Sequence, residues 1–313
     1  MGRISTAIAA NTKNNIINGA FDIWQRTASL SVTANVITYT ADRWAAYSLD
    51  NALTIARITA TSGIQGFGLK LQRNAGQTGT NSVNIAQSAE SINSVPLAGK
   101  TITLTFRAKA GANLSSSGLS VSSRISTGTG TDQNRLNGFT GQVDFTQVNT
   151  LTTSFQTFTQ TVTLAAGINQ FAVVFFYVPT GTAGADDSVT IEQVSLTEGS
   201  TPPPFSRFGK DIEGELAACL RYYERLGDNF MLVNRQYAGA ITSYRLSGIW
   251  RATKRAAPTT TKVGTWSVVN SAQPVVDGST TTGWLLINSV PATGVYEYIT
   301  DSANDYLEAS AEL

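Results

Sequence analysis

The sequence predicts an all-β protein with an N-terminal antiparallel jelly-roll sandwich, a Pro-rich link, one helix and a smaller C-terminal β-domain. Short runs in which apolar and polar residues alternate recur between residues 53 and 196, as in strands buried on one side. Clusters of Gly, Ser, Thr and Asn separate these runs, and no helical pattern lies between them. Eight or more such strands without a helix favour two packed antiparallel sheets.

The composition excludes several classes of function. The chain has 313 residues, enough for two domains with cores, but no His, one Cys and a formal net charge of +1. Without His, neither Ser-His-Asp or Cys-His catalysis nor a His zinc ligand is available. The small net charge gives no global attraction to nucleic acid, no apolar run reaches the length of a membrane span, and the N-terminus lacks the apolar centre of a signal peptide. We therefore expect no nucleic-acid partner and no membrane insertion.

The first half of the chain divides into an arm and the predicted jelly roll. Residues 1–14 carry little periodicity, which predicts an arm that becomes ordered on a partner. The jelly roll is expected over residues 15–199. Within it, residues 101–110 place apolar side chains at alternate positions, so that strand should be buried on one side only. Residues 171–178 are apolar on both faces and should lie in the middle of the domain.

Three prolines at 202–204 are incompatible with a helix or a central strand. They predict a stiff extended link over residues 200–210. A helix follows over residues 211–226, capped by Asp211 and ended by Gly227. Its apolar stripe has helical spacing, and the lone Cys on it is expected to be an inert core thiol. The stripe consists of Ile212, Leu216, Cys219, Leu220, Tyr223 and Leu226. This helix and the Thr-, Val-, Tyr- and Trp-rich runs after it predict a second domain over residues 211–313.

Eight segments in a fixed order carry a resemblance that extends from about Asn14 to the C-terminus. They are NNIINGAFDIWQRT, YTADRWAAY, ITLTFRAKAG, SFQTFTQTVTL, DSVTIEQVSLTEG, ELAACLRYYERL, WRATKRAAPTTT and EASAEL. In this order they resemble bacteriophage tail-fibre or receptor-binding-type structural proteins that carry a carbohydrate-binding-module-like jelly roll. By this resemblance, the first segment is the opening strand of the jelly roll.

The resemblance implies a virion protein, made in the host cytoplasm, that binds a host-surface polysaccharide or other receptor and has no catalytic activity. It also implies a homotrimer whose N-terminal arm attaches to other phage tail or virion proteins. The alternative is a capsid decoration or baseplate scaffold protein whose jelly roll contacts only other virion proteins. A glycan-cleaving enzyme is a third possibility, but the carboxylates have no diagnostic spacing. These carboxylates are Asp144, Asp186, Asp187 and Glu192.

The candidate ligand-binding residues are aromatic, because an aromatic face can stack on a sugar ring. They are Trp24, Trp44, Tyr237 and Trp250. Their alternative role is core packing, which is favoured for Trp24 and Trp44 because both alternate with polar residues near strand starts.

Two further sites are expected. The candidate oligomer interface is Ile212, Leu216, Cys219, Tyr223 and Leu226, where three copies could meet along an axis; otherwise the stripe packs on its own domain. No cofactor is expected, apart from a structural calcium that jelly rolls of this kind often hold. Its oxygens could come from Asp22, Asp186 and Asp187, although adjacent strand residues face opposite ways. The basic cluster Arg251, Lys254 and Arg255 is expected on a solvated edge or at an ion-pairing interface.

Overall fold

A computed structural model shows two compact units, the first formed by residues 1–215 with residue 313 and the second by residues 216–312. The structure describes residues 13–60, 66–227, 230–237, 240–290, 294–300 and 304–313. The predicted arm therefore lies outside the described residues except for its last two, Lys13 and Asn14, which belong to the first unit. The boundary follows Glu215 rather than residue 200, so the Pro-rich link groups with the first unit.

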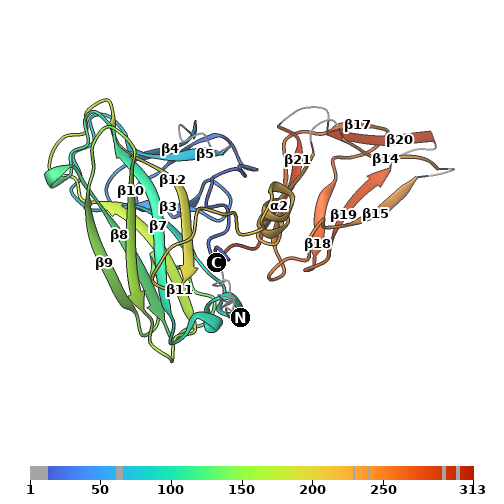
Figure 1. Cartoon of the computed structure of the whole chain (residues 1–313). Coiled ribbons are helices and arrows are strands. Elements are labelled where there is room, and N and C mark those ends of the chain that lie inside the picture. The colour runs from blue at the N-terminus through green and yellow to red at the C-terminus, as the bar shows by residue number, and fades with distance from the viewer. Residues whose placement is uncertain (1–12, 61–65, 228–229, 238–239, 291–293, 301–303) are drawn as a thin grey trace, which may run out of the picture. The chain divides into compact units, whose positions relative to one another are not determined.

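The first unit is the predicted antiparallel sandwich, built from two six-stranded sheets (Figure 1). The first sheet has the order β1-β4-β5-β12-β7-β10. Its strands are β1 (Ser29–Val32), β4 (Leu53–Thr59), β5 (Phe67–Arg73), β12 (Asp187–Glu198), β7 (Thr101–Ala110) and β10 (Gln156–Thr163). The second sheet has the order β2-β3-β6-β11-β8-β9. Its strands are β2 (Thr38–Tyr39), β3 (Ala45–Ser48), β6 (Val83–Ser88), β11 (Gln170–Tyr177), β8 (Ser120–Gly128) and β9 (Val143–Thr150). The chain crosses repeatedly between the sheets, as in a jelly roll.

The core between the sheets confirms the predicted alternation. In β7, Ile102, Leu104 and Phe106 are fully buried and belong to the hydrophobic core. From the opposite sheet, Phe175 of β11 meets Phe106 with ring centroids 4.7 Å apart. As expected, β11 is a central strand, between β6 and β8.

The opening segment of the jelly roll is not a strand, contrary to what the resemblance implied. Residues 17–20 form a turn, and the first strand begins at Ser29. The turn passes so close to β12 that a Cβ on Gly19 would lie 2.1 Å from the carbonyl oxygen of Val194. Only glycine fits there, so Gly19 permits the close packing of the turn against β12.

The predicted helix is shorter than expected. Helix α2 spans Ile212–Leu220, and the chain then enters β13 (Tyr223–Gly227), which pairs with β21 (Tyr306–Ser310). This long-range pairing overrides the local helical pattern. The remaining helical elements are α1 (Ser91–Ser94), η1 (Val95–Leu97), η2 (Ser117–Leu119) and η3 (Arg135–Asn137). In the described parts of the chain, no helix has the length and apolar character needed to cross a membrane.

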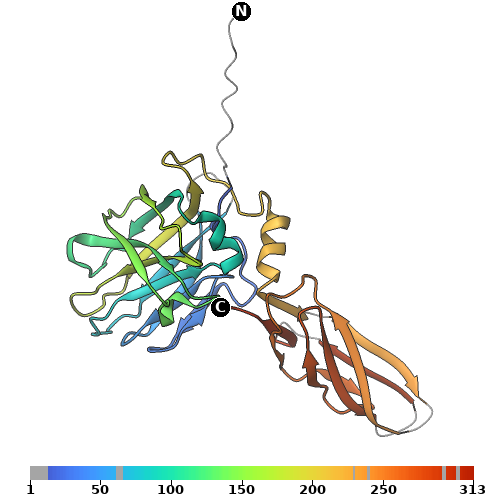
Figure 2. The ribbon, with the colours of Figure 1, turned by 90° about the horizontal axis from the view of Figure 1, so that it is seen from below.

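The second unit contains three three-stranded antiparallel sheets, drawn in orange to red (Figure 2). Their orders are β13-β21-β16, β14-β20-β17 and β15-β19-β18. The remaining strands are β14 (Phe230–Tyr237), β15 (Ile241–Ile249), β16 (Thr259–Val263), β17 (Ser267–Val269), β18 (Val275–Ser279), β19 (Gly283–Val290) and β20 (Gly294–Thr300). The core is aromatic and includes Trp250, Trp266, Trp284 and Tyr296. A second β-domain after the link is thus confirmed.

A buried ion pair connects β5 to β12 in the first unit. Arg73 Nε donates to Asp187 Oδ2 at 2.7 Å, and both side chains are completely buried. Asp187 also accepts hydrogen bonds from the backbone N–H and hydroxyl of Ser115. Burial and the charge of Asp187 raise the pKa of Tyr177, which donates its hydroxyl to the Asp187 carbonyl and stays neutral. These groups satisfy one another, so loss of one partner leaves a buried charge uncompensated.

We expect Arg73→Met to lower the free energy of unfolding by about 3–5 kcal/mol, because the buried Asp187 side chain would lose its counter-ion. Lys100→Met is the control, since it removes a cation from the exposed pair with Glu198 at 2.8 Å and should cost less than about 1 kcal/mol. Urea denaturation of the full chain measures both. Equal losses for the two variants would contradict this account of the buried pair.

Candidate functional site

The aromatic residues selected from the sequence do not form a binding platform. Trp44 is fully buried in the core of the first unit, and its indole donates to the carbonyl of Asn18. Trp24 packs against the same core and donates to the Phe21 carbonyl at 2.7 Å. Trp250 is 4% exposed in the core of the second unit. The side chain of Tyr237 lies outside the described residues. The alternative role, core packing, is therefore the one the structure shows for the three tryptophans.

The three carboxylates proposed as calcium ligands are each engaged by a cation. Asp22 pairs with Arg207, Asp186 with Lys70 and Asp187 with Arg73, each at 2.7 Å. Within the described ranges, no three His, Cys, Asp or Glu side chains come together to hold a metal. The structure does not bring the three carboxylates together, because each one meets an Arg or Lys side chain that neutralises it.

The five residues of the proposed oligomer stripe do not share one helix face. Ile212 is 43% exposed on α2, where Leu216 is half-buried and Cys219 is fully buried. Tyr223 and Leu226 lie on β13 instead, and the Tyr223 hydroxyl donates to Glu308. A seam along one helix is therefore excluded for this set, because the helix ends before its last two members.

The basic cluster of the second unit makes ion pairs and backbone contacts, and of its three members only Lys254 is buried, while Arg251 is exposed. The side chain of Lys254 is completely buried and binds the equally buried carboxylate of Glu224. Arg251 reaches the same carboxylate at 2.8 Å, and Arg255 donates to the Ala311 carbonyl at 3.0 Å. Burial lowers the pKa of Lys254, and Glu224 opposes that effect. These cations stabilise the unit internally.

A different surface, the outer face of the second sheet, presents aromatic side chains. Strand register places five residues side by side across β3, β6, β11, β8 and β9. We call them the aromatic row: Tyr47, Asn84, Phe176, Ser122 and Val148. Their chain neighbours on β6 and β11 point into the core, so side-chain alternation turns the row outward.

The aromatic row is accessible. Tyr47 and Phe176 are half-buried, and Val148 is 67% exposed. The Tyr47 hydroxyl donates to Asn35 at 3.0 Å, and the Asn84 amide donates to the Tyr47 carbonyl at 3.2 Å. Tyr47 and Phe176 are two strands apart, a separation of about 10 Å. The row therefore presents two spaced aromatic rings with an amide between them.

A charged group borders the row on β8 and β9. The guanidinium of Arg124 lies 4.4 Å from the ring centroid of Phe176, and its Nε donates to Thr146 at 3.0 Å. Asp144 pairs with Arg124 at 3.5 Å and with Arg135 at 3.0 Å. Two arginines thus share one carboxylate, which leaves one positive charge in excess.

The loop that carries Arg135 closes one end of this face. Register sets Ser88, Ala172, Ser126 and Asp144 in one row across β6, β11, β8 and β9. Arg135 donates its backbone N–H to Ser88 at 2.9 Å and its Nε to Ser126 at 2.7 Å. Small side chains in this row let the loop lie on the sheet, and the aromatic row four residues further along each strand is left open.

The environment of Asp144 keeps it ionised. Partial burial alone would raise the pKa of Asp144. The hydrogen bond from Ser126 and the charges of Arg135 and Arg124 act in the opposite direction and hold that pKa below the ordinary value of an Asp carboxyl.

The sequence analysis missed these residues, although a signal for them was present. Phe171, Val173 and Phe175 of the apolar run face the core, so Phe176 must face outward. Tyr47 likewise follows a core residue, Ala46, on its strand and must therefore face outward. The strand register that places Tyr47 and Phe176 in one row could not be predicted from the sequence.

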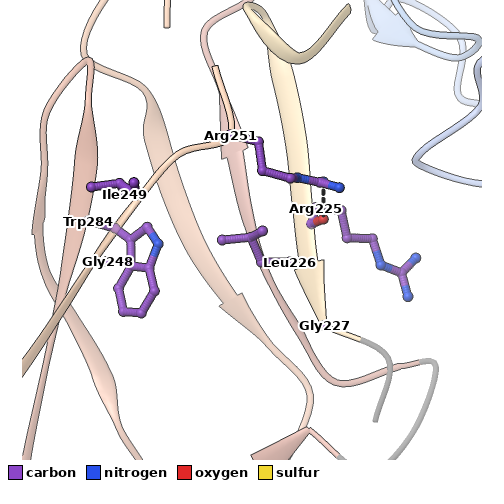
Figure 3. Close-up of a pocket in the computed structure, with 7 residues that line it drawn as sticks. All are labelled: Arg225, Leu226, Gly227, Gly248, Ile249, Arg251 and Trp284. Atoms are coloured by element: carbon purple, nitrogen blue, oxygen red, sulfur yellow. Dashed lines mark hydrogen bonds between the residues drawn. The ribbon is translucent and has the colours of Figure 1, made fainter. Parts of the chain in front are cut away.

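The second unit has an apolar hollow of about 340 Å³ beside Trp284 (Figure 3). Leu226 of β13 and Gly248 and Ile249 of β15 line it. The Arg251 guanidinium donates to the Arg225 carbonyl at 3.0 Å, as the dashed line in Figure 3 shows. A Cβ on Gly248 would lie 2.3 Å from the Trp284 ring, so this glycine permits the close approach of the indole.

No family model matches the chain, and no curated protein matches it. Among solved structures, a bacteriophage CBA120 tailspike protein 4 enzymatically active domain is similar over 59% of this chain, with 13% identity and a TM-score of 0.37. This chain spans 21% of the length of that one. A structure titled "CBM4 structure and function" is similar over 58% of this chain and 98% of its own, with 18% identity and a TM-score of 0.35. TmCBM61 in complex with β-1,4-galactotriose is similar over 60% of this chain and 99% of its own, with 8% identity and a TM-score of 0.32.

We expect Asp144→Asn to lower the free energy of unfolding at pH 7 by about 1 kcal/mol, because it removes the charge that two arginines share. A lowered folded-state pKa contributes stability above the unfolded pKa, and that contribution is lost as the pH falls through the folded value. The difference between variant and wild type should therefore shrink below about pH 4 in urea denaturation. Asp277→Asn, which breaks the more exposed pair with Arg245, is the control. A difference that stays constant to pH 2 would contradict the assigned role of the charge.

Gly248→Ala should destabilise the second unit by about 1–3 kcal/mol, because the new methyl group overlaps the Trp284 ring. Gly278→Ala is the matched control, since a Cβ there meets no atom within 4 Å, and it should change stability by less than about 0.5 kcal/mol. Thermal unfolding followed by tryptophan fluorescence compares them. If the two variants lost equal stability, the close packing of the indole would not be the cause.

Proposed function

We propose that the first unit binds a glycan on the outer face of the second sheet. The observation that carries this proposal is the aromatic row. The apolar C–H surface of a sugar ring packs well on an aromatic face, and Tyr47 and Phe176 are two half-buried rings on this face. Arg124 covers one side of the Phe176 ring, so a sugar would contact the side or edge that Arg124 leaves open. Asn84 lies between the two rings; its amide nitrogen donates to Tyr47 and Ser82, so its oxygen is the group that can accept hydrogen bonds from sugar hydroxyls. Strands hold all three, so the surface is rigid before the ligand arrives.

The role proposed for this face is binding without catalysis. Glycosidases use a pair of carboxyl groups, one of which is a proton donor with a raised pKa. Asp144 is the carboxylate that borders the row, and its pKa is lowered by Ser126 and two arginines. A carboxylate in this state supports the fold and orients Arg124, but it is a poor general acid at neutral pH.

In the biological setting we propose, the protein is a phage tail fibre in the virion that attaches to a host-surface polysaccharide. The order of the sequence segments supports this role, because it resembles tail-fibre and receptor-binding-type proteins from about Asn14 onward. A homotrimer attached to other virion proteins through its N-terminal arm belongs to the same proposal. Sedimentation of the purified full chain would test the trimer.

Tyr47→Ala and Phe176→Ala should each weaken binding to host-surface polysaccharide by tenfold or more, because each removes a stacking surface. The matched control is Phe67→Ala on the first sheet. Phe67 is also half-buried, and Arg57 lies 4.4 Å from its ring centroid, the same distance as between Arg124 and Phe176. Binding of labelled full chain to host cells, with free polysaccharide as competitor, measures the effect.

Two outcomes would contradict the proposal. If all three alanine variants bound as the wild type does, the aromatic row would not be the contact. If the folded wild-type protein bound neither cells nor polysaccharide, a decoration or scaffold role in the virion would replace the glycan-binding role.

A further inference from the structure

The outer face of the first sheet has a polar hollow of about 380 Å³. Its floor comes from the central strand β12, and its walls come from β5 and β7. Ser188 and Thr190 form the floor and are almost completely buried although they face outward. This volume lies within the range of small-ligand sites.

Strand register fixes the cations of this hollow. Thr190 pairs with Lys70 on one side and with Lys109 on the other, so the two lysines flank one hydroxyl in a single row. The hydroxyl of Thr190 has no protein partner in the part of the chain that the structure describes. An ammonium group on each side of a free hydroxyl is a suitable donor set for an oxyanion.

One lysine is neutralised and the other is not. Lys70 pairs with Asp186 at 2.7 Å, and Asp186 also accepts the Ala112 N–H at 2.9 Å and the Ser188 hydroxyl at 2.8 Å. Among the residues that the structure describes, no carboxylate lies within ion-pair distance of Lys109. Its ammonium lies 5.0 Å from the ring centroid of Phe155.

The neighbouring row does not supply the missing negative charge. Register sets Arg107 opposite Glu192 there, and the two form an ion pair. Lys70, Lys109 and Arg107 therefore face two carboxylates, those of Asp186 and Glu192. The excess positive charge lies at Lys109, beside the hollow.

We propose that this hollow binds an oxyanion group, a carboxylate, sulfate or phosphate, with Lys109 as its counter-ion. Lys70 adds a second ammonium, and the hydroxyls of Thr190 and Thr153 donate hydrogen bonds. The carboxylate of Asp186 also lines the hollow and limits the affinity by repulsion. This site lies on the opposite sheet from the aromatic row and does not depend on the function proposed for that row.

Isothermal titration of the full chain at constant ionic strength tests the proposal with sulfate, phosphate, galacturonate and neutral galactose. Saturable binding of at least one anion is expected, and galactose should not compete for it. Tighter binding of galacturonate than of both inorganic ions would identify a sugar acid as the ligand class. Equal affinities would identify the oxyanion group alone.

Lys109→Gln should weaken anion binding by about tenfold, and Lys109→Arg should restore it, because the charge carries the interaction. Lys100→Gln is the matched control, since it removes the same charge from an exposed pair outside the hollow. Asp186→Asn should tighten binding by removing the repulsive carboxylate. Absence of saturable anion binding, or equal losses for Lys109→Gln and Lys100→Gln, would overturn the proposal.

Discussion

The first unit depends on two buried asparagine side chains in its opening segment. Asn14 donates to the carbonyls of Val194 and Ser206 and accepts the N–H groups of Ile16 and Leu196. Asn18 donates to the carbonyls at positions 23 and 42 and accepts the N–H of position 23. A buried segment outside a strand lacks ladder partners, so these amides satisfy backbone groups that would otherwise be orphaned.

The two outer faces of the sandwich carry different kinds of side chains. On both sheets, the alternation of side chains along each strand decides which residues face outward. Both sheets direct apolar residues into a shared core. The residues that alternate with these core residues face outward and determine the chemistry of each outer face. On the second sheet they are aromatic and amide groups around Phe176, and on the first sheet they are lysines around Thr190. Neither face requires a special backbone conformation, because register alone brings residues from distant segments together.

The parts of the fold that the sequence predicted are those with strong periodicity. The one-sided burial of β7 and the central place of β11 follow directly from their residues. Strands β8 and β9 carry a weaker sequence signal, because Ser, Thr and Asn dilute their alternation. The helix was predicted too long because Tyr223 and Leu226 continue a helical spacing while pairing with β21, which is distant in sequence. Of the candidate site, Phe176 could be deduced to face outward, but its place beside Asn84 and Tyr47 is tertiary information.

The loop carrying Arg135 restricts how an extended polymer can lie on the second sheet. This loop blocks the face where Ser88 and Ser126 lie, at one end of β6 and β8. A chain laid parallel to the strands would meet that obstacle after a short distance. A chain laid perpendicular to them would pass from Tyr47 to Val148 along the aromatic row, which crosses five of the six strands of the sheet. The unobstructed direction on this face therefore runs across the strands, along the row to which we assign the glycan contact.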